Sequence, residues 1–176
     1  IADDVEQFQK TMDRIEEQSP HILITTGAVS AGKWDFIPTS LQERNAQIFF
    51  HKTAIKPGKP ILFAQLKSGT TVFALPGNPI STAVGFRFFV APFLQKIFSF
   101  PKKEKQKVML TSCGKKKKGM TFFLKSQSFF NSNGQICARI LQGQESFRMY
   151  PLLETNGWVV LEEHMEEYKS GDVVTF

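Results

Sequence analysis

Two short apolar stretches, each followed by a glycine-containing turn and a helix-forming segment, constrain the fold more than any other feature of this sequence. Residues 21–26 (HILITT) and 71–75 (TVFAL) have the apolar, β-branched composition of buried strands. The first leads into the turn Gly27-Ala28-Val29-Ser30-Ala31-Gly32 and the second into Pro76-Gly77-Asn78-Pro79. Strands that alternate with helices in this way are typical of an α/β layer. We therefore predict an α/β domain with a mostly parallel sheet flanked by helices.

Other elements of this first domain follow from local patterns. Val5, Phe8, Met12 and Ile15 would form one apolar stripe on a helix that ends near residue 18, before a proline. We expect a short helix at residues 39–44, a strand at 46–50, and a hairpin that joins 61–65 to 71–75. Residues 79–98 are apolar on almost every face, which predicts a helix buried between the sheet and another surface. Asn78 and Pro79 suit the N-cap and first positions of that helix.

The composition changes at Phe100-Pro101, where a lysine-rich stretch begins. Beyond it we expect only short strands, at residues 108–111, 121–125, 136–141, 158–161 and 173–176, with a hairpin turn at 131–134. These strands predict a small all-β domain resembling a barrel or a sandwich. The predicted domains are therefore residues 1–101, α/β, and residues 102–176, all-β.

The positive charge of the chain is concentrated in one segment. The net charge is +6, yet residues 102–118 alone contain eight lysines and one glutamate, so the rest of the chain is close to neutral. We interpret the run Lys115 to Lys118, between two glycines, as a solvated turn. RNA binding is a weaker alternative, because no aromatic residue interleaves with this run to stack on bases.

Membrane insertion and disulfide chemistry are not favoured by the sequence. No apolar run approaches the roughly 18 residues needed to cross a bilayer. Cys113 and Cys137 are the only cysteines, and neither has a Cys or His neighbour at metal-ligand spacing. We therefore predict a cytoplasmic protein.

The first glycine turn has the spacing of a phosphate-binding P-loop up to its last position. Gly27, Gly32 and Lys33 match that motif, but Trp34 stands where a Ser or Thr would bind magnesium. Since ligands of α/β sheets bind at the carboxyl ends of strands, the two glycine turns could line one anion pocket. Taken singly, each turn is more simply explained as an ordinary connection between a strand and a helix, whose glycines serve backbone geometry alone.

Charged residues near the two turns extend this hypothesis. Lys52, Lys56 and Lys59 occupy a proline-punctuated segment between the turns, where they could neutralise a phosphate or an oxyanion. Three solvated lysines on a turn are the alternative. Asp35 directly follows the first turn, where it could bind a metal ion, accept hydrogen bonds from an amino-substituted ring, pair with a lysine, or sit near a helix dipole. None of the three histidines is assigned as a ligand.

Three motifs in this order, TTGAVSAGKWDF, HKTAIKPGKP and FALPGNPIS, resemble the molybdopterin molybdenumtransferase family, which includes the catalytic domain of gephyrin. The stretches LQGQESFRMYPLLETNGWVVL and YKSGDVV are similar to the C-terminal β-domain of that family, so the resemblance covers nearly the whole chain. It implies an enzyme of molybdenum cofactor biosynthesis that inserts molybdate into adenylylated molybdopterin and releases AMP. It also implies a homodimer whose active-site cleft is shared between subunits.

The resemblance assigns roles to residues of this chain by position. The catalytic residues would be Asp35, Lys52 and Lys56, with Asp35 also a candidate magnesium ligand. Asp3 or Asp4 resembles a further acidic position of the family. The residues expected to bind the pterin and its phosphate are Gly27, Val29, Ser30, Gly32, Lys59, Pro76, Gly77, Asn78, Pro79 and Ser81. The likeness of the first turn to a P-loop is then coincidental.

The sequence departs from the family at several points. Ala28 stands where a second glycine is usual, and Lys33 stands where an acidic residue is frequent. The two preceding domains and the first strand of the pterin domain are absent, which predicts a C-terminal fragment that could be inactive alone.

Two further interpretations compete with the transferase. The main alternative is a non-catalytic scaffold that keeps the fold, although it would have no need for an acid beside three lysines. A molybdopterin adenylyltransferase is disfavoured by the second, all-β domain.

Overall fold

A computed structural model of the chain describes residues 5–29, 36–101 and 104–176. It divides into two compact units. The α/β unit comprises Ile1–Thr53 and Gly58–Ala91, and the β unit comprises Ala54–Pro57 and Pro92–Phe176. The second unit thus takes a short segment from within the first. The two compact units divide after Ala91, whereas the sequence placed the domain boundary at residue 101. That boundary stays a prediction.

The α/β unit is built on a four-stranded sheet with the order β1-β5-β4-β2. Its strands are β1 (Ile22–Thr26), β2 (Gln47–His51), β4 (Leu62–Gln65) and β5 (Thr71–Leu75). The helical elements are α1 (Val5–Gln18), α2 (Ile37–Glu43), α3 (Pro79–Gly85) and the π-helical turn η1 (Phe86–Val90). The predicted α/β class is confirmed.

The direction of the strands differs from the expected, mostly parallel sheet. β1 and β5 are parallel, whereas the pairs β5–β4 and β4–β2 are antiparallel. The connections explain this difference. β4 and β5 are joined by the predicted tight turn at Gly69, with φ of +89°, and so short a connection can join only antiparallel strands. The long segment between β1 and β5 gives the chain the length that a parallel pairing needs.

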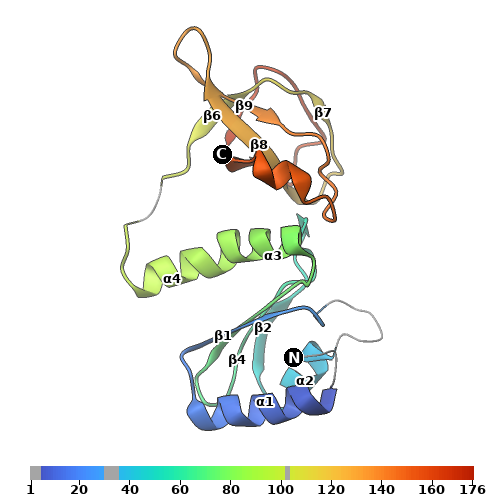
Figure 1. Cartoon of the computed structure of the whole chain (residues 1–176), viewed down its shortest axis with the longest axis vertical. Helices are drawn as coiled ribbons and strands as arrows, with labels where there is room; N and C mark the ends of the chain where they lie inside the picture. Colours follow the sequence, from blue (N-terminus) through green and yellow to red (C-terminus); the bar gives the residue numbers. More distant parts are fainter. Residues whose placement is uncertain (1–4, 30–35, 102–103) are drawn as a thin grey trace. The chain divides into compact units, whose positions relative to one another are not determined.

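Strand alternation places the two faces of this sheet against different helices. Val72 and Ala74 of β5 face a core shared with Phe8 and Met12 of α1 and with residues of α2. Phe73, between them, packs instead against Phe63, with the ring centroids 4.8 Å apart and the rings tilted by 38°. Figure 1 shows α1 and α2 on one side of the sheet and α3 on the other.

The helical segment after β5 is buried over only part of its length. α3 buries Ile80, Ser81 and Val84, whereas α4 (Ala91–Ile97) has no buried residue. Ile97 and Phe98 are 53% and 61% exposed. The expected burial of the whole segment therefore does not hold within one chain.

No helix in the described part of the chain is long and apolar enough to cross a bilayer.

The β unit is a closed five-stranded barrel, as expected. Its strands follow the order β10-β12-β6-β9-β8, and β8 pairs with β10 to close the ring. Their bounds are β6 (Lys107–Leu110), β8 (Thr121–Phe130), β9 (Ile136–Ile140), β10 (Gly157–Leu161) and β12 (Val173–Thr175). The core includes Leu110, Ala138 and Val159. The predicted hairpin turn at residues 131–134 joins β8 to β9, with Gly134 at φ of +73°.

Three short elements complete the β unit. β3 (Ile55–Lys56) pairs in parallel with the first residues of β8. β7 (Gly114–Lys115) and β11 (Glu167–Tyr168) form a two-stranded ribbon, and the 3-10 helix η2 (Tyr150–Leu153) precedes β10.

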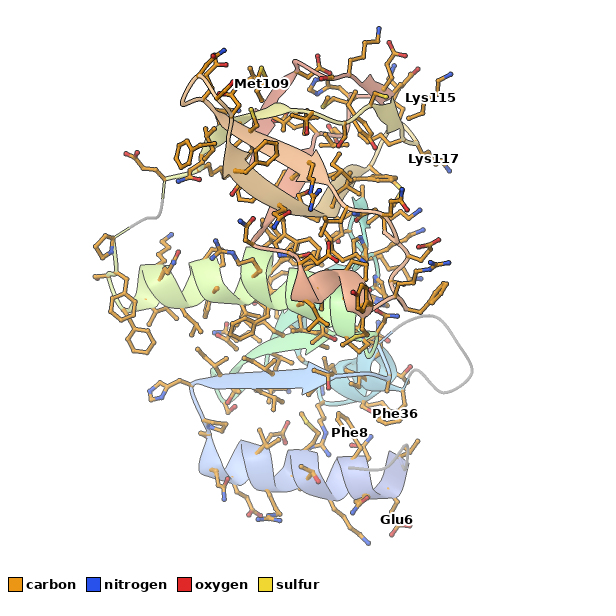
Figure 2. The ribbon with its side chains drawn as sticks, turned by 45° about the horizontal axis from the view of Figure 1, so that its top comes forward. Glu6, Phe8, Phe36, Met109, Lys115 and Lys117 are labelled. Carbon is orange, nitrogen blue, oxygen red and sulfur yellow. The ribbon has the colours of Figure 1, made fainter. Side chains whose placement is uncertain are left out.

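The lysine run at residues 115–118 corrects one sequence prediction. Lys115 and Lys117 are exposed and lie at the periphery of the β unit (Figure 2). Lys116 is only 9% exposed, and its ammonium donates to the carbonyl oxygen of Met120 at 2.7 Å. The run is therefore not a uniformly solvated turn, because one of its lysines caps backbone carbonyls inside the unit.

Candidate functional site

The two glycine turns meet at the ends of the parallel strands β1 and β5. Thr26 and Leu75, the last residues of these strands, are partners in the ladder, and the Gly27 amide donates to the Leu75 carbonyl at 2.9 Å. A Cβ atom on Gly77 would lie only 3.1 Å from Gly27 Cα, so the two backbones are in contact. The structure thus brings together the two turns that the sequence singled out, as the parallel pairing requires.

Each turn is shaped by its own residues. Gly27 has φ of +91°, a conformation open mainly to glycine, and Ala28 accepts a left-handed φ of +49° despite its Cβ. In the second turn Asn78 is the predicted N-cap, since its Oδ1 accepts from the amides of Ile80 at 3.1 Å and Ser81 at 3.5 Å. These amides are therefore occupied within the turn. Pro79 takes the first helical position as expected.

Some residues assigned to the pterin pocket are buried or lie outside the described residues. Val29 is 1% exposed in the core, while its carbonyl oxygen accepts a hydrogen bond from His51 Nε2 at 2.9 Å. Because a carbonyl can only accept, Nε2 of His51 carries the proton. Ser81 is 6% exposed. The candidates that lie outside the described residues are Asp3, Asp4, Ser30, Gly32 and Asp35.

The threonines next to these segments have hydroxyl groups without partners. Among the described residues, Thr25 Oγ1 and Thr53 Oγ1 are buried and accept or donate no hydrogen bond. A buried hydroxyl without a hydrogen-bond partner costs free energy. Thr25 belongs to β1, one residue before the end of that strand, and Thr53 follows Lys52 in the same unit.

The three candidate lysines fall into different units. Lys52 and Lys59 belong to a tight loop of the α/β unit, where the Lys52 amide donates to Ile61 and the Lys59 carbonyl accepts from Thr53. Lys52 has a left-handed φ of +68°. Lys56 belongs to the β unit, where its neighbour in the ladder is Phe122 of β8. The sequence suggested that residues 52–59 form a single loop. The structure instead divides them between the two units.

Lys56 lies at a solvent-open cavity of about 530 Å³ on the β unit. Its ammonium nitrogen is 5.3 Å from the centre of the Phe122 ring. Within the described residues, no carboxylate oxygen lies within 4.0 Å of this nitrogen. The residues that line this cavity include Cys113, Phe122, Gly143, Gln144, Glu145 and Tyr168. The Glu145 carboxylate is paired with Arg148 at 3.3 Å, which leaves Lys56 as a cation free to meet an anion.

A buried lysine fixes the wall of this cavity. Lys125 is fully buried, and its ammonium donates to the carbonyl oxygens of Gly143 at 2.6 Å, Arg148 at 2.9 Å and Glu145 at 3.3 Å. Burial lowers the pKa of Lys125, an effect that the nearby Glu145 carboxylate opposes. The Gln144 side chain bonds to both backbone groups of Lys125. One residue of β8 therefore holds residues 143–148 in place.

Sequence reasoning missed Lys125, Lys116 and Phe122. A charged residue within the otherwise apolar start of β8 was the one available signal, since a lysine between Leu124 and Ser126 interrupts a buried run. Its carbonyl partners lie 18 to 23 residues further along the chain, where no local pattern marks them.

Tyr168 provides a pH-dependent probe of the cavity. Burial raises the pKa of its phenol above the ordinary value of 10.0, and a negative Cys113 thiolate would raise this pKa further. The neutral phenol thus stabilises the fold below pH 10, and this contribution is lost as the pH rises through the higher folded-state pKa.

We expect the phenolate absorbance of Tyr168 to appear above pH 10 in the folded chain. The chain has two tyrosines, so the titration of the unmodified protein minus that of Tyr168→Phe isolates one phenol. Tyr150→Phe is the matched control, since Tyr150 is 73% exposed. A difference curve with its midpoint at or below 10 would show that the Tyr168 ring is hydrated.

No metal centre is apparent among the described residues. Within residues 5–29, 36–101 and 104–176, no three His, Cys, Asp or Glu side chains gather as a metal-binding group. Asp35, the expected magnesium ligand, is not among them. Because that position is outside the described residues, no chemical step below is derived through a magnesium ion.

Glycine turns at the carboxyl ends of parallel strands are a common arrangement for receiving anionic groups in α/β proteins. Comparisons with known proteins specify the class. Residues 1–96 match the family model described as a probable molybdopterin binding domain, and residues 107–176 match the MoeA C-terminal region, domain IV. The chain belongs to the molybdopterin molybdenumtransferase family.

Several named relatives support this membership. The chain is 32% identical to a molybdopterin molybdenumtransferase of Haemophilus influenzae over 99% of its length and 43% of that protein. It is 46% identical to the enzyme of that name from Synechococcus elongatus over 53% of this chain and 24% of that protein. Gephyrin of Dictyostelium discoideum is 35% identical over 57% of this chain and 16% of that protein. The chain thus spans less than half of each of these relatives.

A solved structure has the same fold. The molybdopterin biosynthesis MoeA protein of Pyrococcus horikoshii aligns with a TM-score of 0.70 and 25% identity, over 98% of this chain and 38% of that one. This likeness supports both the α/β unit and the barrel, and it supports a role in molybdenum cofactor biosynthesis together with the relatives above.

Proposed function

We propose that this chain carries part of the active site that inserts molybdenum into adenylylated molybdopterin, with release of AMP. The observation that carries the proposal is Lys56, a cation without a carboxylate partner among the described residues, at a cavity next to an aromatic ring. Family membership supplies the substrate class. The glycine turns of the α/β unit would receive the pterin and its phosphate through Gly27, Gly77 and their neighbours.

Lysine residues suit the chemistry of this reaction. Breaking the phosphoanhydride and capturing the doubly charged molybdate both place negative charge near the protein. Lys52 and Lys56 would stabilise that charge electrostatically rather than transfer protons, and Lys59 would contribute to substrate binding. Asp35 remains the proposed acidic residue of the site and the proposed magnesium ligand. We further propose that the protein works in the cytoplasm as a homodimer.

AMP release from adenylylated molybdopterin, with molybdate and magnesium present, tests this function. The chain should be compared with the parent polypeptide extended at its N-terminus, because the relatives are more than twice as long. Release by the extended protein, alone or together with the chain, would support the transferase. Failure of both to release AMP, with folding confirmed by circular dichroism, would contradict it.

The scaffold alternative has one observation in its favour. Phe147, Tyr150 and Leu153, on and before η2, are 71%, 73% and 82% exposed. Clustered exposed apolar side chains are a feature of surfaces that bind other proteins. A folded extended protein that releases no AMP would shift the assignment to this alternative.

A further inference from the structure

The backbone of Lys56 is fixed against the strand that carries Phe122. Ile55 and Lys56 are ladder partners of Thr121 and Phe122, and the Thr121 amide donates to the Ala54 carbonyl at 2.9 Å. Ladder partners place their side chains on the same face of a sheet. The short strand β3 therefore delivers the Lys56 side chain to the Phe122 ring.

Two ammonium groups contact this one ring. Lys56 Nζ is 5.3 Å and Lys116 Nζ is 5.2 Å from its centroid. Both distances are within the range of about 6 Å for an attractive cation–π contact. The two like charges lie beside the same ring, so they repel each other, and the electron-rich ring compensates part of that repulsion.

The two lysines differ in their freedom. Lys116 is 9% exposed and donates to carbonyl oxygens of Met120 at 2.7 Å, Lys117 at 3.4 Å and Glu163 at 3.5 Å. Its ammonium is thus tied to the backbone. Lys56 is exposed and has the ring as its recorded side-chain partner among the described residues. A flexible lysine side chain that meets an anion must first lose rotamer freedom, and a contact that restricts it beforehand reduces that cost.

We propose that Phe122 is a positioning residue, which holds the Lys56 ammonium over the cavity so that it meets an anionic group there. Lys116 adds a fixed positive potential without touching the anion. The inference rests on the proposed function, because that function assigns Lys56 to the anion site. Phe122 itself is not among the site residues that the family resemblance assigned. It also explains why an apolar ring lies beside a lysine at the cavity.

The first test is of the contact itself. In the proton spectrum, the ε-methylene of Lys56 should show an upfield ring-current shift, identified by its disappearance in Lys56→Met. The shift should be lost in Phe122→Leu and kept in Phe122→Tyr, which preserves the ring. A Lys56 methylene at its ordinary position in the unmodified chain would overturn the proposal.

The second test uses the affinity of AMP for the chain, measured by calorimetry at low ionic strength. Loss of a cation–π contact corresponds to a two- to fivefold change, so Phe122→Leu should weaken AMP binding by roughly that factor. Phe122→Tyr should restore it. In the Lys56→Met background, Phe122→Leu should have no further effect. Phe129→Leu, on the same strand and 40% exposed, is the matched control and should bind AMP normally.

Each other outcome contradicts the proposal in a distinct way. Equal losses from Phe122→Leu with and without Lys56 would show a packing effect that does not act through the lysine. Unchanged AMP affinity in Lys56→Met would show that Lys56 does not meet the anion. AMP binding is measured without turnover. A failure to release AMP would therefore contradict the proposed function but would not affect the test of Phe122 as a positioning residue.

Discussion

The Lys125→Met variant is expected to lose about 2 to 4 kcal/mol of the free energy of unfolding of the β unit. Methionine keeps the length and apolar stem of lysine but removes the ammonium that Gly143, Glu145 and Arg148 use as a common donor. Three carbonyl oxygens then lose their partner inside the unit. Removing the buried charge returns part of this cost, because burial already lowers the pKa of Lys125 and so disfavours its charged form.

The backbone bonds between Lys125 and Gln144 remain in the variant, so the measurement isolates the ammonium. Urea unfolding followed by tryptophan fluorescence gives the free energy, since Trp158 lies in β10 of the same barrel. Lys117→Met is the control with an equal change of charge at an exposed position, expected within about 0.5 kcal/mol of the unmodified chain. Equal stability of Lys125→Met and the control would mean that the three bonds contribute nothing net.

Lys56→Met is expected to lower the rate of AMP release by roughly 100-fold in the protein form that is active. Removing one group that stabilises charge in a transition state costs about two to three orders of magnitude. Since most of the effect belongs to the transition state, kcat should fall by a much larger factor than KM rises. The Lys67→Met variant is the control, because Lys67 is an exposed lysine on the β4–β5 turn.

A different partition of the loss would change the assignment. A higher KM with unchanged kcat would place Lys56 in substrate binding alone. An unchanged rate, with folding confirmed, would remove it from the site.

Local patterns predicted the elements whose stability depends on near neighbours. The β4–β5 turn follows from glycine at a left-handed position, and the start of α3 follows from Asn78 and Pro79. The meeting of Gly27 and Gly77 also follows from sequence, once the two strands are taken as adjacent and parallel. These are the parts of the candidate site that could be predicted.

The parts that could not be predicted depend on pairings between distant residues. Lys56 looked like one of three lysines on a single loop, whereas a two-residue strand joins it to β8, more than 60 residues away. Lysine side chains are almost never buried unless paired, so neither Lys116 nor Lys125 was expected to be buried within the β unit. Their burial is stabilised by backbone carbonyls, which every residue carries and no sequence motif reports.

The small strand β3 also limits how this protein can be taken apart or recombined. The two family models match continuous stretches, yet the polypeptide passes between the units after Thr53, after Pro57 and after Ala91. A hybrid made by joining residues 92–176 to another protein would leave the first residues of β8 with an open edge and would lose the lysine from the cavity. The barrel therefore cannot be exchanged between relatives as residues 92–176 alone. The exchanged part also has to include Ala54–Pro57.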